Sequence, residues 1–267
     1  MYRQLLIPVK EASEVEPTID IGARLLEPNG EIRILHIIPT TRMPQVTREW
    51  RASVNIVVPA HETGAALDVR VEPEVRANVD VPGEILESAE AHEVDAILMT
   101  LAGDRRSRNP FVGHTASAVL HHARCDVVIV NRLALAGGRV PRILLPTLGE
   151  MPTPRALQIA EELGLKMPGV GLTVLSLAPG KAGSAPPDPL ATSPRGLPLQ
   201  HKYVGGALPA LRRRRLPGFL LQVAARERYG LLLIGEDSRA GGTALLTRHF
   251  LEDLFRAAPC PVIAVRS

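Results

Sequence analysis

The chain has 267 residues, of which 45% are apolar and 22% charged, a balance that predicts a globular protein of one large or two ordinary domains. Aromatic residues make up only 3%, so we expect an aliphatic core, and no apolar run approaches the roughly 20 residues of a membrane-spanning helix. The net charge of +3, the start without a signal segment and the two cysteines favour a cytoplasmic protein without a disulfide framework.

The first half of the chain alternates predicted strands and helices. Gln4–Val9 is short and nearly continuously apolar, as in a strand that is buried on both faces. The elements expected after it are a helix over Thr18–Leu26, a turn at Pro28–Gly30, a strand over Glu31–Ile38, a helical piece around Val46–Val54, an edge strand over Asp68–Val75, a helix over Gly83–Glu93, a strand over Ala96–Thr100, a helix over Ala116–His122 and a strand over Asp126–Val130.

The second half follows the same order. Its expected elements are strands at Arg142–Pro146, Leu172–Ala178, near Ala207–Arg214, Leu231–Gly235 and Pro261–Val265, and helices at Pro154–Leu163, Gly218–Tyr229 and Arg248–Ala257. The segment Pro179–His201 is rich in Pro, Gly, Ser and Ala, so we interpret it as a long loop, either functional or, as we favour, disordered.

An internal repeat relates the two halves. The stretch that begins at Val81 aligns with the stretch that begins at Leu216, and the offset of 135 residues continues without a gap to the end of the chain. Cys125 falls on Cys260 in this alignment. We therefore predict an α/β protein of two tandem doubly wound parallel-sheet domains, residues 1–136 and 140–267, with the long loop 179–201 in the second domain.

The last third of each half carries a family resemblance. The second half contains APCPVIAV at Ala258–Val265, and the first contains the variant ARCDVVIV at Ala123–Val130. With the order of elements, these segments resemble the universal stress protein family. The resemblance implies an adenine-nucleotide alpha-hydrolase-like fold, and a glycine-rich loop after the fourth strand that binds phosphates at a helix N-terminus.

The glycine signature of the family is incomplete in both halves. In the first half, Gly103 and Gly113 keep their positions with nine residues between them, while Thr100 stands at the first glycine position, His114 replaces the small hydroxyl residue and Thr115 follows it. In the second half Gly235 remains, but Ser238 and Arg248 stand at the other two positions. The adenine-contacting Asp that the family has after strand one is replaced by Lys10 and by Leu148.

A ligand site is therefore expected in the first half, for ATP or another anionic ligand. Its candidate residues are Lys10, Gly103, Arg105, Gly113, His114 and Thr115. Local alternatives remain open: His114 can cap or pack locally, and the cluster Arg105–Arg108 can be a solvated loop tip. Spacing identifies no metal site, and both cysteines are expected to be buried small hydrophobes.

The partners follow from the resemblance and from charge. Family members dimerise through their final strands, which implies an intramolecular pseudo-dimer through Val127–Val130 and Val262–Val265, with a homodimer also open. The run Arg212–Arg215 is placed on the edge strand near Ala207–Arg214, where charge opposes unwanted pairing; binding to an anionic membrane surface is the alternative. Neither basic cluster has aromatic neighbours, which disfavours nucleic acid.

The sequence shows no catalytic motif of a hydrolase, P-loop enzyme or zinc protease. We therefore predict a non-enzymatic, stress-related regulatory protein with weak or absent nucleotide binding. The alternatives are an accessory module that binds a partner protein such as a membrane transporter and, third, an ATP-binding ATPase.

Overall fold

The computed structural model describes residues 1–40, 43–101, 114–131, 142–147, 152–166, 169–177, 191–203, 215–236 and 246–267. The chain divides into two compact units. Unit 1 comprises Met1–Thr100 and Val112–Val128, and unit 2 comprises Leu101–Phe111 and Ile129–Ser267. The predicted boundary near Ala136–Val140 lies outside the described residues.

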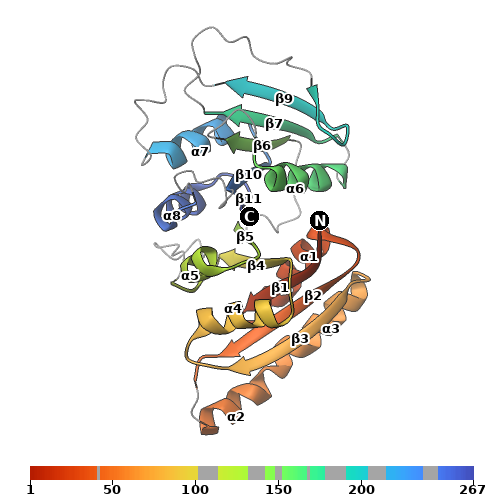
Figure 1. The fold of residues 1–267 in the computed structure, drawn as a ribbon, viewed down its shortest axis with the longest axis vertical. Coiled ribbons are helices and arrows are strands. Elements are labelled where there is room, and N and C mark those ends of the chain that lie inside the picture. The colour runs from red at the N-terminus through yellow and green to blue at the C-terminus, as the bar shows by residue number, and fades with distance from the viewer. Residues whose placement is uncertain are drawn as a thin grey trace. The chain divides into compact units, whose positions relative to one another are not determined.

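The first half forms a parallel sheet in the strand order β3-β2-β1-β4-β5. Its strands are β1 (Tyr2–Val9), β2 (Leu26–Ile38), β3 (Arg70–Ala77), β4 (Ala96–Leu101) and β5 (Asp126–Asn131). Its helices are η1 (Ala12–Glu14), α1 (Val15–Leu25), α2 (Met43–Ala52), α3 (Val54–Ala66), α4 (Val81–Ala91) and α5 (His114–His122). Helices α1 and α3 pack together on one face, and α4 and α5 on the other (Figure 1). This is the predicted doubly wound arrangement.

Aliphatic side chains make the core of this sheet, as the composition predicts. Leu5, Leu6 and Ile7 of β1 are fully buried, because the strand is covered on both faces. Helix α1 approaches the sheet closely at Gly22, where a Cβ atom would lie 2.9 Å from the terminal methyl groups of Ile7 and Ile32. A larger residue at this position would push the helix away from the strands.

A charged cluster joins β3 to α4. The Arg76 guanidinium lies between two carboxylates, 2.5 Å from Glu74 and 2.7 Å from Glu84. Glu84 also accepts a hydrogen bond from the Asn78 side chain at 2.7 Å, and only 10% of its side chain is exposed. The N-terminus of α4 is capped by Asp80, which accepts from the Gly83 N–H at 3.1 Å. These contacts fix the edge strand to the helix that follows it.

The second half repeats the pattern in the order β11-β10-β6-β7-β9-β8. Its strands are β6 (Arg142–Thr147), β7 (Gly171–Ser176), β8 (Ala191–Thr192), β9 (Pro198–Tyr203), β10 (Leu231–Glu236) and β11 (Val262–Arg266). Its helices are α6 (Pro154–Leu165), α7 (Leu216–Arg226) and α8 (Arg248–Ala257). Within this half, β10 pairs in parallel with β11 and β6, and β7 with β6 and β9, whereas β8 and β9 are antiparallel.

The third strand of the second half is not where the sequence predicts it. β9 pairs in parallel with β7, so it takes the place that β3 has in the first half. The prediction of a loop over 179–201 is therefore wrong for residues 191–201, which contain β8 and the start of β9. The third-strand position in this sheet is therefore not taken by the strand that was expected near Ala207–Arg214 with its run of Arg residues. Residues 204–214 lie outside the described part, and Arg215 precedes α7.

The predicted helical piece in the first half is confirmed and extends further than expected. Helices α2 and α3 are separated only by Ser53 and together run from Met43 to Ala66. Along the described residues, none of the helices combines the length and apolar content needed to cross a membrane.

Candidate functional site

The carboxyl edge of the first sheet holds the part of the predicted site that the structure describes. Lys10 directly follows β1, which pairs in parallel with β4 through Leu5 with Ala96 and Leu6 with Ile97, so the two strands end at the same edge of the sheet. His114 and Thr115 begin α5, the helix that follows the loop after β4. The other three candidates, Gly103, Arg105 and Gly113, lie outside the described residues.

The turn after β1 contains an acidic side chain that sequence reasoning did not single out. The Glu14 carboxylate accepts hydrogen bonds from the backbone N–H groups of Lys10, at 2.8 Å, and Glu11, at 3.3 Å. These two N–H groups stand at the end of a parallel strand, where a ligand of this fold would meet the backbone. Because Glu14 already uses them, the exposed Lys10 side chain is what this turn offers to an anion.

His36 is a second residue that the sequence analysis missed at this edge. It lies in β2 opposite Val9 of β1, and its Nδ1 is 3.1 Å from the Val9 carbonyl oxygen. Since a carbonyl only accepts, Nδ1 carries the hydrogen of this bond. Its position near the end of β2, one strand from Lys10, is the feature from which the sequence could have identified His36 as a residue of this edge.

The N-terminus of α5 carries partial positive charge that no acidic residue of its first turn offsets. His114 is exposed there and Thr115 is half-buried. Lys10 and this helix start therefore supply positive potential at the ends of two adjacent strands, β1 and β4. That arrangement suits an anion.

In the second half, the retained glycine has a packing role. A Cβ atom on Gly235 would overlap the Thr153 hydroxyl oxygen and lie 2.5 Å from the Ala156 Cβ. Thr153 is the N-cap of α6 and accepts from the Ala156 N–H at 3.3 Å. The close approach of α6 to β10 therefore requires glycine here whether or not a phosphate binds.

A carboxylate of the chain itself lies beside the last helix of the second half. Glu236, the final residue of β10, accepts a hydrogen bond from the Leu246 N–H at 3.2 Å. The next residue, Thr247, is the N-cap of α8, and its hydroxyl accepts from the Phe250 N–H at 3.4 Å. Leu148 and Ser238 lie outside the described residues.

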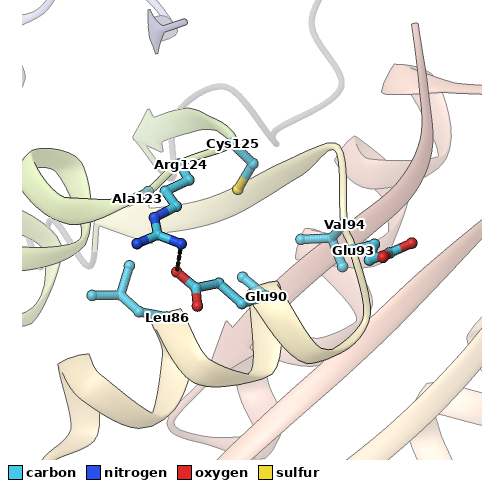
Figure 2. A pocket seen from close by; sticks show the side chains of 8 residues that line it. Leu86, Glu90, Glu93, Val94, Ala123, Arg124 and Cys125 are labelled. Carbon is cyan, nitrogen blue, oxygen red and sulfur yellow. Dashed lines mark ion pairs between the residues drawn. The ribbon is translucent and has the colours of Figure 1, made fainter.

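A pocket of about 210 Å³ lies at the opposite, amino-terminal ends of β4 and β5 (Figure 2). Its lining residues are Leu86, Ala89, Glu90, Glu93, Val94, Ala123, Arg124 and Cys125. Arg124 and Glu90 pair at 3.3 Å across it, so these two charges satisfy one another. The pocket is separate from the Lys10 edge.

Neither cysteine is activated. Burial raises the pKa of the Cys125 thiol to about 11, although this residue is only partly buried. Burial likewise raises the pKa of the Cys260 thiol to about 11, and Cys260 is 5% exposed, as predicted for a small hydrophobe. Both thiols stay protonated at neutral pH. In the described part of the chain, no three His, Cys, Asp or Glu residues gather to hold a metal ion.

The strand order and the helices on both faces define a class, the doubly wound α/β proteins, here with two such domains in tandem. The model of the Universal stress protein family matches residues 1–131. The chain therefore carries a first domain that belongs to the universal stress protein family, followed by a second domain with the same fold.

Solved structures support the tandem fold over nearly the whole chain. A universal stress protein from Archaeoglobus fulgidus is 17% identical, with a TM-score of 0.64, and the match covers 98% of this chain and 95% of that one. A putative universal stress protein from Pseudomonas aeruginosa is 12% identical, with a TM-score of 0.55 and coverage of 99% and 93%.

The cytoplasmic domain of a prokaryotic cation chloride cotransporter is also similar, at 13% identity and a TM-score of 0.56, with coverage of 99% and 95%. At these identities the likeness concerns the fold. Curated proteins give no match to the sequence.

Proposed function

We propose that this chain is a non-enzymatic, stress-related regulatory protein in which at most the first domain binds an anionic ligand, ATP or another anion, and binds it weakly. The observation that carries the proposal is the Glu236 carboxylate on the Leu246 N–H. It puts a negative charge of the protein at the helix start where a nucleotide phosphate would have to enter.

The size of this effect follows from Coulomb's law. Two unit charges about 4 Å apart repel by about 1 kcal/mol in water and by about 4 kcal/mol at the effective dielectric constant of a protein surface. A phosphate near Glu236 would thus lose roughly fivefold to a thousandfold in affinity. The first domain combines Lys10 with the start of α5 and the predicted loop residues Gly103, Arg105 and Gly113, so any binding is expected there.

Nucleotide analysis of the full chain tests the proposal. The protein is purified without added nucleotide, any bound nucleotide is released by acid and identified, and ATP and inorganic phosphate are then titrated calorimetrically. We expect little co-purified nucleotide and weak binding that Gly113→Val and Lys10→Ala abolish. Tight ATP binding that survives both substitutions, or ATP hydrolysis that the purified chain catalyses, would contradict the proposal.

The Glu236→Gln variant is the matched test of the second domain. It keeps the side-chain length and one acceptor for the Leu246 N–H but removes the charge. We expect it to leave first-domain binding unchanged and to raise any phosphate affinity of the second domain. Strong ATP binding to the second domain of the wild-type chain would show that the carboxylate does not exclude phosphate.

We also propose that the two domains pair through β5 and β11. Support comes from within unit 2, which includes the end of β5: the Asn131 side-chain oxygen accepts from the Val262 N–H at 3.0 Å. An Asn131→Leu substitution should then speed hydrogen exchange at the amide of Val262 and leave β1 unchanged. Equal exchange in both proteins would remove this support.

A second candidate function is an accessory module that binds a partner protein. The fold likeness to the cytoplasmic domain of a cotransporter favours it. A chain that carries no nucleotide and forms a stoichiometric complex with a purified transporter would support this candidate; no complex at micromolar concentrations would argue against it.

A further inference from the structure

An apolar stripe faces solvent on the outer side of α2 and α3. It consists of Trp50, Val54 and Val58, whose exposed fractions are 52%, 56% and 46%. Helix α3 buries a different side, with Ile56, Ala60 and Gly64. Clusters of exposed large apolar residues are uncommon on monomeric proteins and mark interaction surfaces.

The three residues form one stripe because helical bonding continues through the junction of the two helices. Ser53 has helical dihedral angles, its N–H donates to the Glu49 carbonyl at 2.9 Å, and its own carbonyl accepts from the Val57 N–H at 3.0 Å. Residues spaced by four along a helix lie on one side of it. The stripe therefore runs without interruption from α2 into α3.

Charges flank the stripe in a pattern that complements itself. Arg48 precedes it with 78% of its side chain exposed, and exposed Glu62 follows it. At a rise of about 1.5 Å per residue, these charges are separated by about 21 Å along the helices. A helical wheel places both on the same flank of the apolar stripe.

We propose that the stripe pairs with the same stripe of a second copy in an antiparallel, two-fold symmetric contact. Such symmetry places Arg48 of each copy opposite the partner's Glu62, and Trp50 beside the partner's Val58. Val54 of the two copies meets near the axis. Each copy thus offers the other an apolar surface and both charges in the required order.

The charge balance of the two helices favours a second copy of the chain over a membrane as the partner. Across α2 and α3 the cations Arg48 and Arg51 are matched by Glu49 and Glu62. An anionic lipid surface attracts clusters of uncompensated Lys and Arg, which this helix pair lacks. A contact of one helix pair is small, so we expect a dimer with a dissociation constant on the order of micromolar.

Trp50 makes the contact directly measurable, because it is the chain's single tryptophan. The full chain is studied by sedimentation velocity and by tryptophan emission over a concentration series through the micromolar range. We expect monomer and dimer to exchange with concentration, and the Trp50 emission to shift to the blue in step with the dimer fraction. Val54→Glu brings two carboxylates together at the axis and should abolish both changes.

A charge exchange provides the decisive control. Arg48→Glu and Glu62→Arg each turn two attractive contacts into two repulsive ones, so each should weaken the dimer about tenfold. The double variant restores opposite charges and should recover most of the wild-type affinity. Glu87→Arg, an exposed position on α4 on the other face of the sheet, should leave the dimer unchanged.

Four outcomes would overturn the inference. The first is a chain that stays monomeric at all concentrations, and the second is a Trp50 emission that is blue-shifted at every concentration because the chain itself covers the stripe. The third is a double variant that dimerises as weakly as the single variants. The fourth is a blue shift that is seen only with vesicles of anionic phospholipid. None depends on nucleotide binding, so this test and that of the proposed function fail separately.

Discussion

The ion-pair cluster between β3 and α4 predicts a pH-dependent loss of stability in a Glu84→Gln variant. Glu84 accepts from Arg76 and from Asn78, each at 2.7 Å, with its side chain 10% exposed. Glutamine keeps one oxygen but turns the other position into a donor that faces a donor. One hydrogen bond to a charged group is then lost, and the free energy of unfolding should fall by about 1.5–3 kcal/mol at neutral pH.

The sign of the pH dependence follows from the pKa of Glu84. The hydrogen bond from Arg76, above all, and then that from Asn78 hold this pKa below its ordinary value of 4.5. A lowered folded-state pKa contributes stability that is present above the unfolded value and lost as the pH falls through the folded value. The wild-type chain should therefore lose its advantage over Glu84→Gln in acid.

Urea unfolding followed by circular dichroism, at pH 7 and at about pH 3, measures both effects. Hydrogen exchange of the β3 and α4 amides assigns the loss to unit 1. Glu87→Gln, an exposed change on the same helix, is the control and should cost less than about 0.5 kcal/mol. A variant as stable as wild type at pH 7, or equally destabilised at both pH values, would refute the reasoning.

Three other perturbations have expected outcomes of their own. Gly235→Ala forces α6 away from β10 and should lower the free energy of unfolding in urea by about 1–3 kcal/mol. In the same titration Gly218→Ala should be neutral or slightly stabilising, because nothing lies within 4 Å of the new Cβ atom. Thr247→Ala removes the N-cap of α8 and should cost about 1 kcal/mol, which unchanged unfolding would contradict. At pH 7, Cys125 and Cys260 should react with iodoacetamide about 100-fold more slowly than ordinary thiols, because burial raises the pKa of each thiol from 9.0 to about 11. Unfolding in urea should remove this difference in rate, and fast labelling of the folded chain would disprove the prediction.

Much of the fold was accessible from the sequence because most of its elements are strongly patterned and occur twice. Helix α8 has the predicted bounds, Arg248–Ala257, and β5 ends one residue beyond Val130. β9 was missed because Pro198 starts it and, among the side chains of β9 whose burial is described, Leu199 is the one buried apolar residue. Its stability comes from pairing with β7, a contact that local composition does not reveal.

The candidate site was less predictable for a similar reason. Motif spacing gave the positions of Lys10 and His114, but the roles of Glu14, His36 and Glu236 depend on which backbone groups they meet. His36 bonds a carbonyl 27 residues away, on a neighbouring strand. Such partners are known only once the strand register is known.

The Glu236 carboxylate also changes how the two halves can respond to the cell. A group attached to the chain competes with free ligands at an effective concentration that nothing in solution alters. The Leu246 N–H, which lies just before α8, thus has an acceptor within the chain whose local concentration does not vary with the nucleotide level. Under the proposed function, the second half would then act as a constant reference, and a signal that depends on ligand concentration would originate in the first.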